Sequence, residues 1–268
     1  MADPGRRAKK GERFRALHEG EPFVIPNPWD GGTAKVLEAL GFPALATTSS
    51  GFAFSLGRPD GEATLEEVLE HTRLLDSISA LPVSVDLEEG HGPAPADAAA
   101  AIEAAAAAGA VGGSIEDYDR ERGRLYEIPE ATERVGAAAA AAAGLGFPFT
   151  FTARAENHIR GNPDLDDTIA RLRAYEAAGA DVLYAPGLRL ADEVRVVCEA
   201  VEKPVNVLGH RGLTLDDVFA AGAQRVSVGG ALAWTAIEAM AASAEAVRDR
   251  GDLSGLAGTS RIRDWLAS

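Results

Sequence analysis

The feature that most constrains the fold is a unit that occurs eight times along the chain. In each unit a short β-rich run is followed by a polar or glycine-containing turn and then by an amphipathic or alanine-rich helical run. The β-rich runs are PFVIPN, ALATTSS, PVSVDLE, VGGSIEDY, PFTFTARAE, DVLYAPG, KPVNVLG and QRVSVGG. Strands that alternate with helices form parallel sheets. Eight such units in 268 residues therefore predict an α/β fold, a closed (β/α)8 TIM barrel.

The ends of the helical runs support this pattern. A glycine follows five of the predicted helices, at positions where a left-handed residue commonly ends a helix. These glycines are Gly41, Gly109, Gly144, Gly179 and Gly222. No stretch is long or flexible enough to link two domains. We therefore expect residues 1–268 to form a single barrel domain in which residues 1–12 are a flexible basic tail, and we place His18 and His71 on exposed faces of helices.

Composition excludes several classes of protein. A formal net charge of −15 and a sequence pI of about 4.8 disfavour nucleic-acid binding, which needs a basic surface. No apolar stretch is long enough to cross a membrane, and no apolar segment of a secretory signal follows the basic start. The single cysteine, Cys198, rules out an intrachain disulfide framework and a multi-cysteine zinc site. We expect a cytoplasmic protein that contacts neither nucleic acid nor membrane.

Acidic residues stand where the third and fourth β-rich runs end, and active sites of such barrels lie at the carboxyl ends of the strands. Asp86 and Glu88 are spaced i, i+2, which on a strand points both side chains to one face. Glu116 follows on the next strand. Three carboxylates without clustered His or Cys favour a hard cation, Mg2+ or alternatively Mn2+. Because such an ion keeps several waters, some carboxylates would hold it through water.

Other groups at the strand ends suit an anionic substrate. Arg154 offers a planar fork of donors for a carboxylate or an enolate oxygen, and backbone N–H groups near Gly51 and Phe52 would add donors to an oxyanion. With a metal, these groups predict a site for a small 2-oxo acid that reacts through an enolate. Two alternatives remain: a solvated rim of charges, and a phosphate-binding barrel isomerase or synthase that uses the SVGG segment.

Several motifs make the chain resemble the isocitrate lyase/phosphoenolpyruvate mutase superfamily, in its phosphoenolpyruvate phosphomutase-like branch, over nearly its whole length. The matching stretches are FRALHEGEPFVIPNPWDGGTAKVLEALGFPALATTSSG, SLGRPDG, VSVDLEEGHG, GGSIEDY, FTARAE, KPVNVL and RVSVGG. The resemblance implies that Asp86, Glu88 and Glu116 form an Mg2+ cluster, mostly through bound waters, and that Asp60 supports the metal and the substrate.

The resemblance also implies the substrate-binding residues and the class of reaction. It assigns Ser50, Gly51 and Phe52 to the substrate carboxylate and oxyanion, and Arg154 to substrate binding. Asn206, from the seventh β-rich run, is a further predicted substrate-binding residue. Members of the superfamily cleave or form C–C or C–P bonds next to a 2-oxo acid, through a pyruvate enolate. They are homo-oligomers, often tetramers, in which the last barrel helix is exchanged between subunits. The apolar run ALAWTAIEAMAASAEAV is consistent with such a helix.

One loop departs from the superfamily pattern. Isocitrate and methylisocitrate lyases carry a Lys-Lys-Cys-Gly-His loop after the fourth strand, whereas residues 117–130, DYDRERGRLYEIPE, contain neither Cys nor His. They also lack the Lys and Asn of the phosphonate-handling members. Cleavage of isocitrate is therefore disfavoured, and the loop is expected to act as a lid. His91, His158 and His210 are candidate replacements for acid–base work, since histidine titrates near neutral pH.

These observations predict a Mg2+-dependent carbon–carbon lyase that acts on a small 2-oxo or hydroxy acid. Arg154, Asp60, His158 and His210 are the predicted catalytic residues. Oxaloacetate decarboxylation is the simplest reaction of this kind, because carbon dioxide leaves without the missing loop base, and cleavage of a substituted malate is the next. The alternatives are a phosphoenolpyruvate mutase or phosphonopyruvate hydrolase activity, and a catalytically degraded relative that binds a metabolite. A homo-oligomer, a dimer or a tetramer, is expected in each case.

Overall fold

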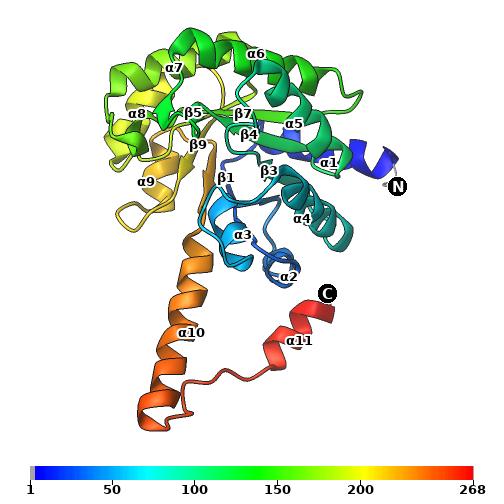
Figure 1. The fold of residues 1–268 in the computed structure, drawn as a ribbon, viewed down its shortest axis with the longest axis vertical. Coiled ribbons are helices and arrows are strands. Elements are labelled where there is room, and N and C mark those ends of the chain that lie inside the picture. Colours follow the sequence, from blue (N-terminus) through cyan, green and yellow to red (C-terminus); the bar gives the residue numbers. More distant parts are fainter. Residues whose placement is uncertain (1–3, 268) are drawn as a thin grey trace.

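The sheet observed is the barrel that the sequence predicts. The computed structural model describes residues 4–267, and its main sheet has eight parallel strands in the order β1-β10-β9-β8-β7-β4-β3-β2 (Figure 1). Their bounds are β1 Phe23–Ile25, β2 Leu45–Ala46, β3 Val83–Asp86, β4 Gly112–Glu116, β7 Thr150–Arg154, β8 Val182–Tyr184, β9 Val205–Leu208 and β10 Arg225–Ser227. The first and last strands of this order approach each other where the Ala46 N–H donates to the Pro26 carbonyl at 3.0 Å, so the barrel is nearly closed.

Helices surround the sheet, and two of them extend away from it. Their bounds are α1 Pro4–Leu17, α2 Gly31–Ala39, α3 Ser49–Ser55, α4 Leu65–Ile78, α5 Pro95–Ala107, α6 Ile128–Ala143, α7 Leu165–Ala177, α8 Ala191–Ala200, α9 Leu215–Ala220, α10 Ala231–Arg250 and α11 Ser260–Ala267. In Figure 1, α10 projects from the barrel, and α11 returns to contact α2. None of the helices within residues 4–267 combines the length and apolar character that crossing a membrane requires.

The helices begin and end at residues suited to those positions. Asp30 caps α2 by accepting the Thr33 N–H at 2.7 Å, as an N-cap carboxylate should. Four of the five predicted glycines adopt a left-handed conformation, and Gly109 does so with φ 112°. Gly144 is the exception, because it caps α6 with φ −78° and the left-handed residue is Gly146 two positions later. The prediction for Gly144 was therefore wrong.

The main core lies between the strands and helices α4 to α9. The alanine-rich helices α5 and α6 contact each other through small side chains, among which Ala101 and Ala138 are fully buried. Such small residues let two helices and the strands beneath them approach closely. The alanine tracts are therefore packing surfaces of the barrel wall, which positions the strand ends that carry the site.

The amino-terminal segment forms a helix instead of the predicted tail. Residues 4–17 form α1, and Lys10 on this helix is buried, with its Nζ 2.6 Å from Asp76 Oδ1 and 2.9 Å from the Ser79 carbonyl. Phe14 is fully buried in a small core beneath the sheet. Residues 4–12 are therefore helical where a tail was predicted, because Arg6 and Lys10 find partners at the end of α4. Residues 1–3 lie outside the described part of the chain.

Two histidines that were expected on the surface are buried. His18 hydrogen-bonds the Phe14 carbonyl through Nδ1 at 2.9 Å, and its Nε2 lies 3.1 Å from Arg225 Nη1. His71 stacks on Phe52 with 4.3 Å between the ring centroids. Burial lowers the pKa of His18 to about 3, assisted by Arg225, and the pKa of His71 to about 4. Both are therefore neutral core residues, which a helical position alone did not reveal.

The buried His71 predicts a loss of stability in acid. Its folded-state pKa of about 4 lies below the ordinary value of 6.5, so the unfolded chain takes up the proton first as the pH falls. Stability contributed by neutral His71 is present above pH 6.5 and is lost as the pH falls towards 4, by roughly 2 kcal/mol at pH 5. We expect His71→Leu to lose about that much less stability than the wild type between pH 7 and pH 5, measured by urea unfolding.

The matched control for this experiment is Leu74→Gln on the same helix, because Leu74 is 46% exposed and carries no titratable group. This variant should show the same loss between pH 7 and pH 5 as the wild type. If stability falls equally with pH in His71→Leu and the wild type, the pKa of His71 is the same in the folded and the unfolded chain, and the expected effect of burial is absent.

Candidate active site

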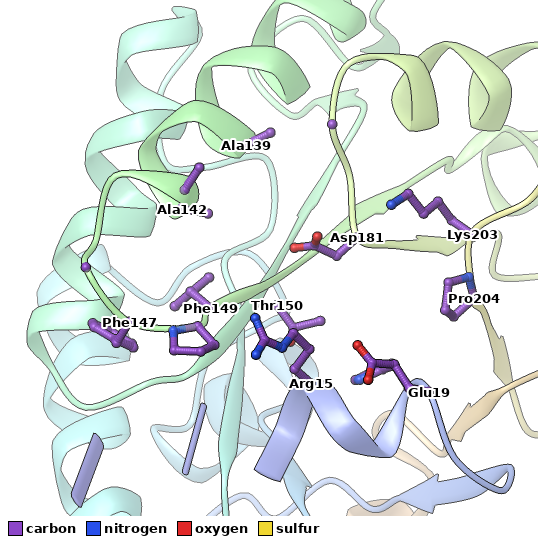
Figure 2. Close-up of a pocket in the computed structure, with 15 residues that line it drawn as sticks. Arg15, Glu19, Ala139, Ala142, Phe147, Phe149, Thr150, Asp181, Lys203 and Pro204 are labelled. Carbon is purple, nitrogen blue, oxygen red and sulfur yellow. The ribbon is translucent and has the colours of Figure 1, made fainter. Parts of the chain in front are cut away.

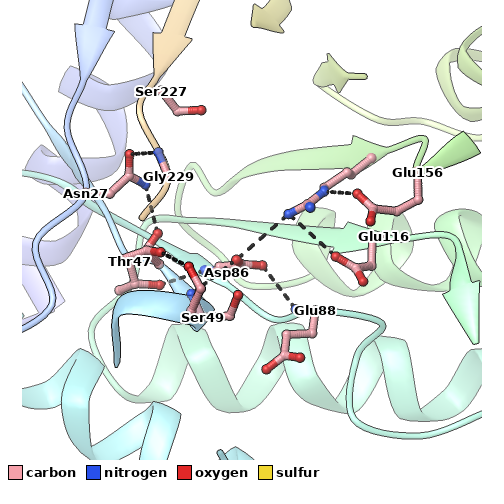
Figure 3. A network of polar contacts seen from close by, with 12 residues as sticks. Asn27, Thr47, Ser49, Asp86, Glu88, Glu116, Glu156, Ser227 and Gly229 are labelled. Carbon is pink, nitrogen blue, oxygen red and sulfur yellow. Dashed lines mark hydrogen bonds and ion pairs between the residues drawn. The ribbon is translucent and has the colours of Figure 1, made fainter. Parts of the chain in front are cut away.

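Three predicted site residues meet at the carboxyl end of the barrel. Asp86 ends β3, Glu116 ends β4 and Arg154 ends β7. Arg154 Nη1 lies 3.9 Å from Asp86 Oδ2 and 3.5 Å from Glu116 Oε2, while its Nε donates to Glu156 (Figure 3). The register of the sheet causes this meeting, because Glu116 is paired directly with Arg154 and paired residues point to the same side of a sheet.

Glu88 reaches the site by a different route from the predicted one. The strand ends at Asp86, and Glu88 lies in the following turn with φ 52°, a left-handed conformation that is uncommon for a residue other than glycine. Its N–H donates to Asp86 Oδ1 at 3.2 Å, and its carbonyl accepts the Glu116 N–H at 2.8 Å. The carboxylate of Glu88 is buried and pairs with Arg120 at 2.6 Å. The i, i+2 spacing therefore placed Glu88 correctly beside Asp86, but the two residues do not share one face of a strand, because the strand ends at Asp86.

Burial disfavours the ionised form of two of these carboxyl groups. Desolvation raises the pKa of Glu88 to about 8, although the charge of Arg120 opposes the shift. Desolvation also raises the pKa of Glu116 well above its usual range, with Arg154 opposing. The negative charge of Asp86 contributes to both increases. Additional positive charge at this position would therefore stabilise the carboxylates as anions.

These residues fit a divalent cation that keeps part of its water shell. Within residues 4–267 no three His, Cys, Asp or Glu side chains are close enough together to bind an ion directly, so a dry site of three carboxylates is not formed. The donors are nevertheless all oxygen, and the charge of Asp86 acts on the ionisation of both Glu88 and Glu116. An all-oxygen donor set with water between the ion and some carboxylates is typical of Mg2+.

A two-stranded hairpin follows β4 where a lid loop was predicted. Its strands are β5 Tyr118–Asp119 and β6 Arg124–Leu125. From its turn Arg120 reaches the acidic cluster, with Nη2 2.6 Å from Glu88 Oε2 and 3.7 Å from Glu116 Oε1. Arg160, which lies over the Tyr118 ring, approaches Glu116 at 3.5 Å. Sequence reasoning missed both arginines, and the signal for Arg120 was the density of arginine in DRERGR.

The predicted oxyanion segment is already hydrogen-bonded internally. Ser50, Gly51 and Phe52 lie in α3, which Thr48 caps. The Gly51 N–H points to Thr48 Oγ1 at 3.4 Å, and the Phe52 N–H donates to the Thr48 carbonyl at 3.0 Å. The Ser49 N–H is the one that faces the acids, at 3.4 Å from Asp86 Oδ2. The backbone donor that faces the cluster is therefore two to three residues earlier than Gly51 and Phe52.

Asp60 and the candidate histidines differ in their relation to the acidic cluster. Asp60 lies in the exposed turn after α3, and its charge contributes to the raised pKa of Glu88. Desolvation lowers the pKa of His91, against the charges of Glu89 and Asp86. Within residues 4–267, neither His158 nor His210 contacts Asp86 or Glu88. The charges that act on His158 are those of Glu193 and Asp164. The ring of His210 accepts the Gly212 N–H.

A small cavity lies inside the mouth of the barrel. It measures about 60 Å³, and its lining includes Asp86, Arg154, Tyr184, Asn206 and Arg225. Both polar atoms of the Asn206 amide are engaged, because Nδ2 donates to a serine hydroxyl at 3.0 Å and Oδ1 accepts from Arg225 Nε at 2.8 Å. Asn206 therefore faces the cavity as a fixed group and contributes to the shape of its floor.

A larger cavity of about 580 Å³ lies at the opposite end of the barrel (Figure 2). Its lining includes Thr150 and Pro204, which stand at the amino ends of strands. The cavity is also lined by four exposed charged residues, Arg15, Glu19, Asp181 and Lys203. Active sites of (β/α)8 barrels lie at the carboxyl ends of the strands. We therefore assign the candidate active site to the smaller cavity and its acidic rim.

The SVGG segment is held by a side chain and is not arranged to cradle a phosphate. The N–H groups of Val228 and Gly229 both donate to Asn27 Oδ1 at 2.9 Å, and Asn27 Nδ2 donates to the Thr47 carbonyl at 2.9 Å (Figure 3). These amides are the donors that a phosphate would need. The alternative of a phosphate-binding isomerase therefore loses its structural support.

Several known proteins resemble this chain over most of its length. A candidate lyase/mutase from Burkholderia cenocepacia J2315 is 50% identical, with a TM-score of 0.95 and coverage of 98% of both chains. An oxaloacetate decarboxylase of Rhodopseudomonas palustris (strain HaA2) is 31% identical over 91% of this chain and 88% of its own. The structure of an oxaloacetate acetylhydrolase in complex with the product oxalate is 25% identical, with a TM-score of 0.86 and coverage of 99% and 96%.

A family model extends this likeness to most of the chain. The model, described as phosphoenolpyruvate phosphomutase, matches residues 14–248, a range that includes every predicted site residue. The relatives and the structural neighbours are lyases and mutases, so the chain is an enzyme of that kind. The (β/α)8 barrel, the carboxylate and arginine cluster at its carboxyl end and this match together show that the chain belongs to the phosphoenolpyruvate phosphomutase family, within the isocitrate lyase/phosphoenolpyruvate mutase superfamily.

Proposed function

We propose that the protein is a Mg2+-dependent lyase that breaks a C–C bond next to a 2-oxo acid, and that oxaloacetate decarboxylation is its simplest reaction. The observation that carries the proposal is Arg154, whose guanidinium lies between Asp86 and Glu116 at the mouth of the barrel. A planar donor fork beside an all-oxygen set of carboxylates suits a 2-oxo acid bound to a hard cation. The oxaloacetate-handling relatives support the same class of substrate.

The chain's own residues would position the substrate and stabilise charge. Asp86, Glu88 and Glu116 would hold the cation, which supplies positive charge to an enolate oxygen when it is bound. Arg154 is fixed through its Nε by Glu156, so its remaining donors stay directed at the site without reorganisation. Burial of these groups strengthens their attraction for the carboxylate and the enolate oxygen of the substrate.

Decarboxylation would proceed in two steps. The C3–C4 bond of oxaloacetate breaks, its electron pair forms the enolate of pyruvate, and C4 leaves as carbon dioxide. The enolate then takes a proton at C3 to give pyruvate. The hairpin that carries Arg120 lies over the acidic cluster, where it would exclude bulk water during the first step. Because Arg120 pairs with Glu88, binding of the cation would release this arginine.

The test is release of pyruvate from oxaloacetate by the purified protein. We expect release that requires Mg2+ and that EDTA abolishes, after subtraction of the reaction that Mg2+ catalyses without protein. If no pyruvate forms, substituted malates and phosphonopyruvate are the next substrates to assay. Failure with all of these, together with thermal stabilisation by oxalate and Mg2+, would support a catalytically degraded relative that binds a metabolite.

The proposal includes assembly into a homo-oligomer through α10. This helix projects from the barrel (Figure 1) and exposes large apolar side chains, including Trp234 at 41% and Met240 at 64% of their surface. Apolar patches of this kind mark protein interfaces. We expect light scattering to give a mass that is two or four times the 27.9 kDa of the chain. Met240→Glu should shift the protein towards the monomer, because it would place a charge in the apolar contact.

The control for assembly is Leu190→Glu, since Leu190 is also exposed, at 61%, but lies before α8 on the barrel. This variant should keep the mass of the wild type. A wild type that is monomeric at micromolar concentration would contradict the proposed assembly. The proposal also retains a cytoplasmic location, with which a single free cysteine, Cys198, is consistent.

A further inference from the structure

Arg225 occupies the same row of the barrel as Arg154. Arg154 is paired with Tyr184, Tyr184 with Asn206, and Asn206 with Arg225. Successive partners across a sheet point to one side of it, and all four residues line the cavity inside the mouth of the barrel. The tilt of barrel strands explains why a residue that begins β10 lies in a row with residues that end β7 and β8.

The hydrogen-bonding partners of Arg225 are all neutral. Its Nε donates to Asn206 Oδ1 at 2.8 Å, its Nη2 donates to Thr152 Oγ1 at 3.1 Å, and its Nη1 lies 3.1 Å from His18 Nε2. His18 stays uncharged because burial lowers its pKa to about 3. It can therefore accept a hydrogen bond through Nε2 while its Nδ1 donates to the Phe14 carbonyl.

No carboxylate compensates Arg225 within the part of the chain that the structure describes. The residue is only 5% exposed, and its charge interacts with Tyr184 but with no acidic group. A buried charge without a partner of opposite sign is costly. Its retention on the wall of a cavity indicates that an anion enters that cavity.

Arg171 is as deeply buried but pairs with Asp117. Within residues 4–267, Arg134 also lacks a carboxylate partner, but it lies over the Tyr126 ring and donates to the Glu89 carbonyl. It does not line this cavity.

The cavity has one acidic and two basic residues in its lining, namely Asp86, Arg154 and Arg225. In the proposed function Asp86 holds the cation and Arg154 faces the 2-oxo acid end of the substrate. Three of the five N–H groups of Arg225 have acceptors, and no described residue accepts the other two. We infer that Arg225 binds the second carboxylate of the substrate and makes the site selective for dicarboxylic over monocarboxylic acids. This inference rests on the proposed function for the identity of the first binding group.

The inferred contact has a definite kinetic signature. In decarboxylation the second carboxylate loses its charge as carbon dioxide leaves. A guanidinium beside that group therefore stabilises the bound substrate more than the transition state. Removal of Arg225 should raise KM for oxaloacetate by at least about tenfold, while kcat stays the same or increases. A purely structural role would lower kcat and stability without this separation.

The direct test compares malate with lactate, because malate is lactate with one additional carboxylate. Calorimetric titration in the presence of Mg2+ should show that the wild type binds malate at least about tenfold more tightly than lactate. Arg225→Gln should lose that preference while its affinity for lactate stays within about twofold. Arg225→Lys keeps the charge but loses the planar donor fork, so its preference for malate should lie between those of the wild type and Arg225→Gln.

Thr152→Val is the matched control, because it removes one hydrogen bond of Arg225 and keeps the charge. It should retain the preference for malate. An unchanged preference in folded Arg225→Gln would overturn the inference. If neither Arg225 variant folds, equal affinity of the wild type for malate and lactate would overturn it as well.

The titration also separates the inference from the proposed function. If the wild type does not act on oxaloacetate but prefers malate over lactate through Arg225, the proposed reaction is contradicted and the inferred role of Arg225 is kept. A wild type that acts on oxaloacetate, and whose preference for malate survives Arg225→Gln, would remove only the inferred role of Arg225.

Discussion

Asp86→Ala is expected to lower Mg2+-dependent turnover of oxaloacetate by about 10³-fold. Asp86 is the one acidic residue that lines the cavity at the mouth of the barrel. Its carboxylate faces Arg154 at 3.9 Å and accepts the Glu88 N–H at 3.2 Å. The substitution would remove the anion that places the cation beside the substrate, so the rate should no longer depend on Mg2+ above the background without protein.

Asp192→Ala is the matched control for this measurement. Asp192 forms an ion pair with Arg195 at 3.3 Å, but its side chain is 90% exposed and lies on α8, where such a pair contributes little. Its turnover and Mg2+ dependence should equal those of the wild type. Near-normal activity in Asp86→Ala, with circular dichroism showing a folded protein, would contradict the assignment of the metal site.

Asp117→Ala is expected to give the largest loss of stability, about 3–5 kcal/mol in the free energy of unfolding. Asp117 is buried, and its Oδ1 accepts the Glu156 N–H at 2.7 Å. Its Oδ2 accepts from Arg171 Nη1 at 3.0 Å and from the Tyr175 hydroxyl. The substitution would leave the buried Arg171 guanidinium with the partly exposed Asp167 as its remaining anionic partner, in addition to an unpaired hydroxyl and an unpaired amide.

Urea unfolding at pH 7 measures this loss, and Asp192→Ala again serves as the control, with an expected change of less than about 0.5 kcal/mol. Asp117→Asn separates charge from hydrogen bonding, because the amide oxygen can still accept while the ion pair with Arg171 is lost. If the free energy of unfolding of Asp117→Ala is within about 1 kcal/mol of the wild-type value, the Asp117–Arg171–Tyr175 network does not stabilise the barrel wall as its contacts indicate.

From the sequence it was possible to place those site residues whose position depends only on where a strand ends. The carboxyl ends of parallel strands share one edge of the barrel, so Asp86, Glu116 and Arg154 could be placed together without knowing the path of any loop. Glu116 and Asp117 illustrate the limit of that reasoning, since both end the same β-rich run. Alternation of side chains sends one into the site and the other into the wall.

Residues in turns and short helices could not be placed in this way. The role of Glu88 depends on a left-handed residue after β3, and the donors of α3 depend on whether the helix starts at Ser49 or later. Neither feature has a periodic pattern in the sequence. Arg225 was missed for another reason, because it begins its strand and only the register and tilt of the barrel bring it into the row of Arg154.

The pairing of β1 with β10, the first and last barrel strands in chain order, has a consequence for how the chain folds. Phe23 pairs with Arg225 and Val24 with Val226, so β1 contacts β10 across about two hundred residues of sequence. Contacts of such long range form slowly, because the intervening chain must first be brought together. During synthesis β1 leaves the ribosome long before its neighbour exists. The ring is therefore completed only after the last strand has been made, and its closure belongs to the final stage of folding.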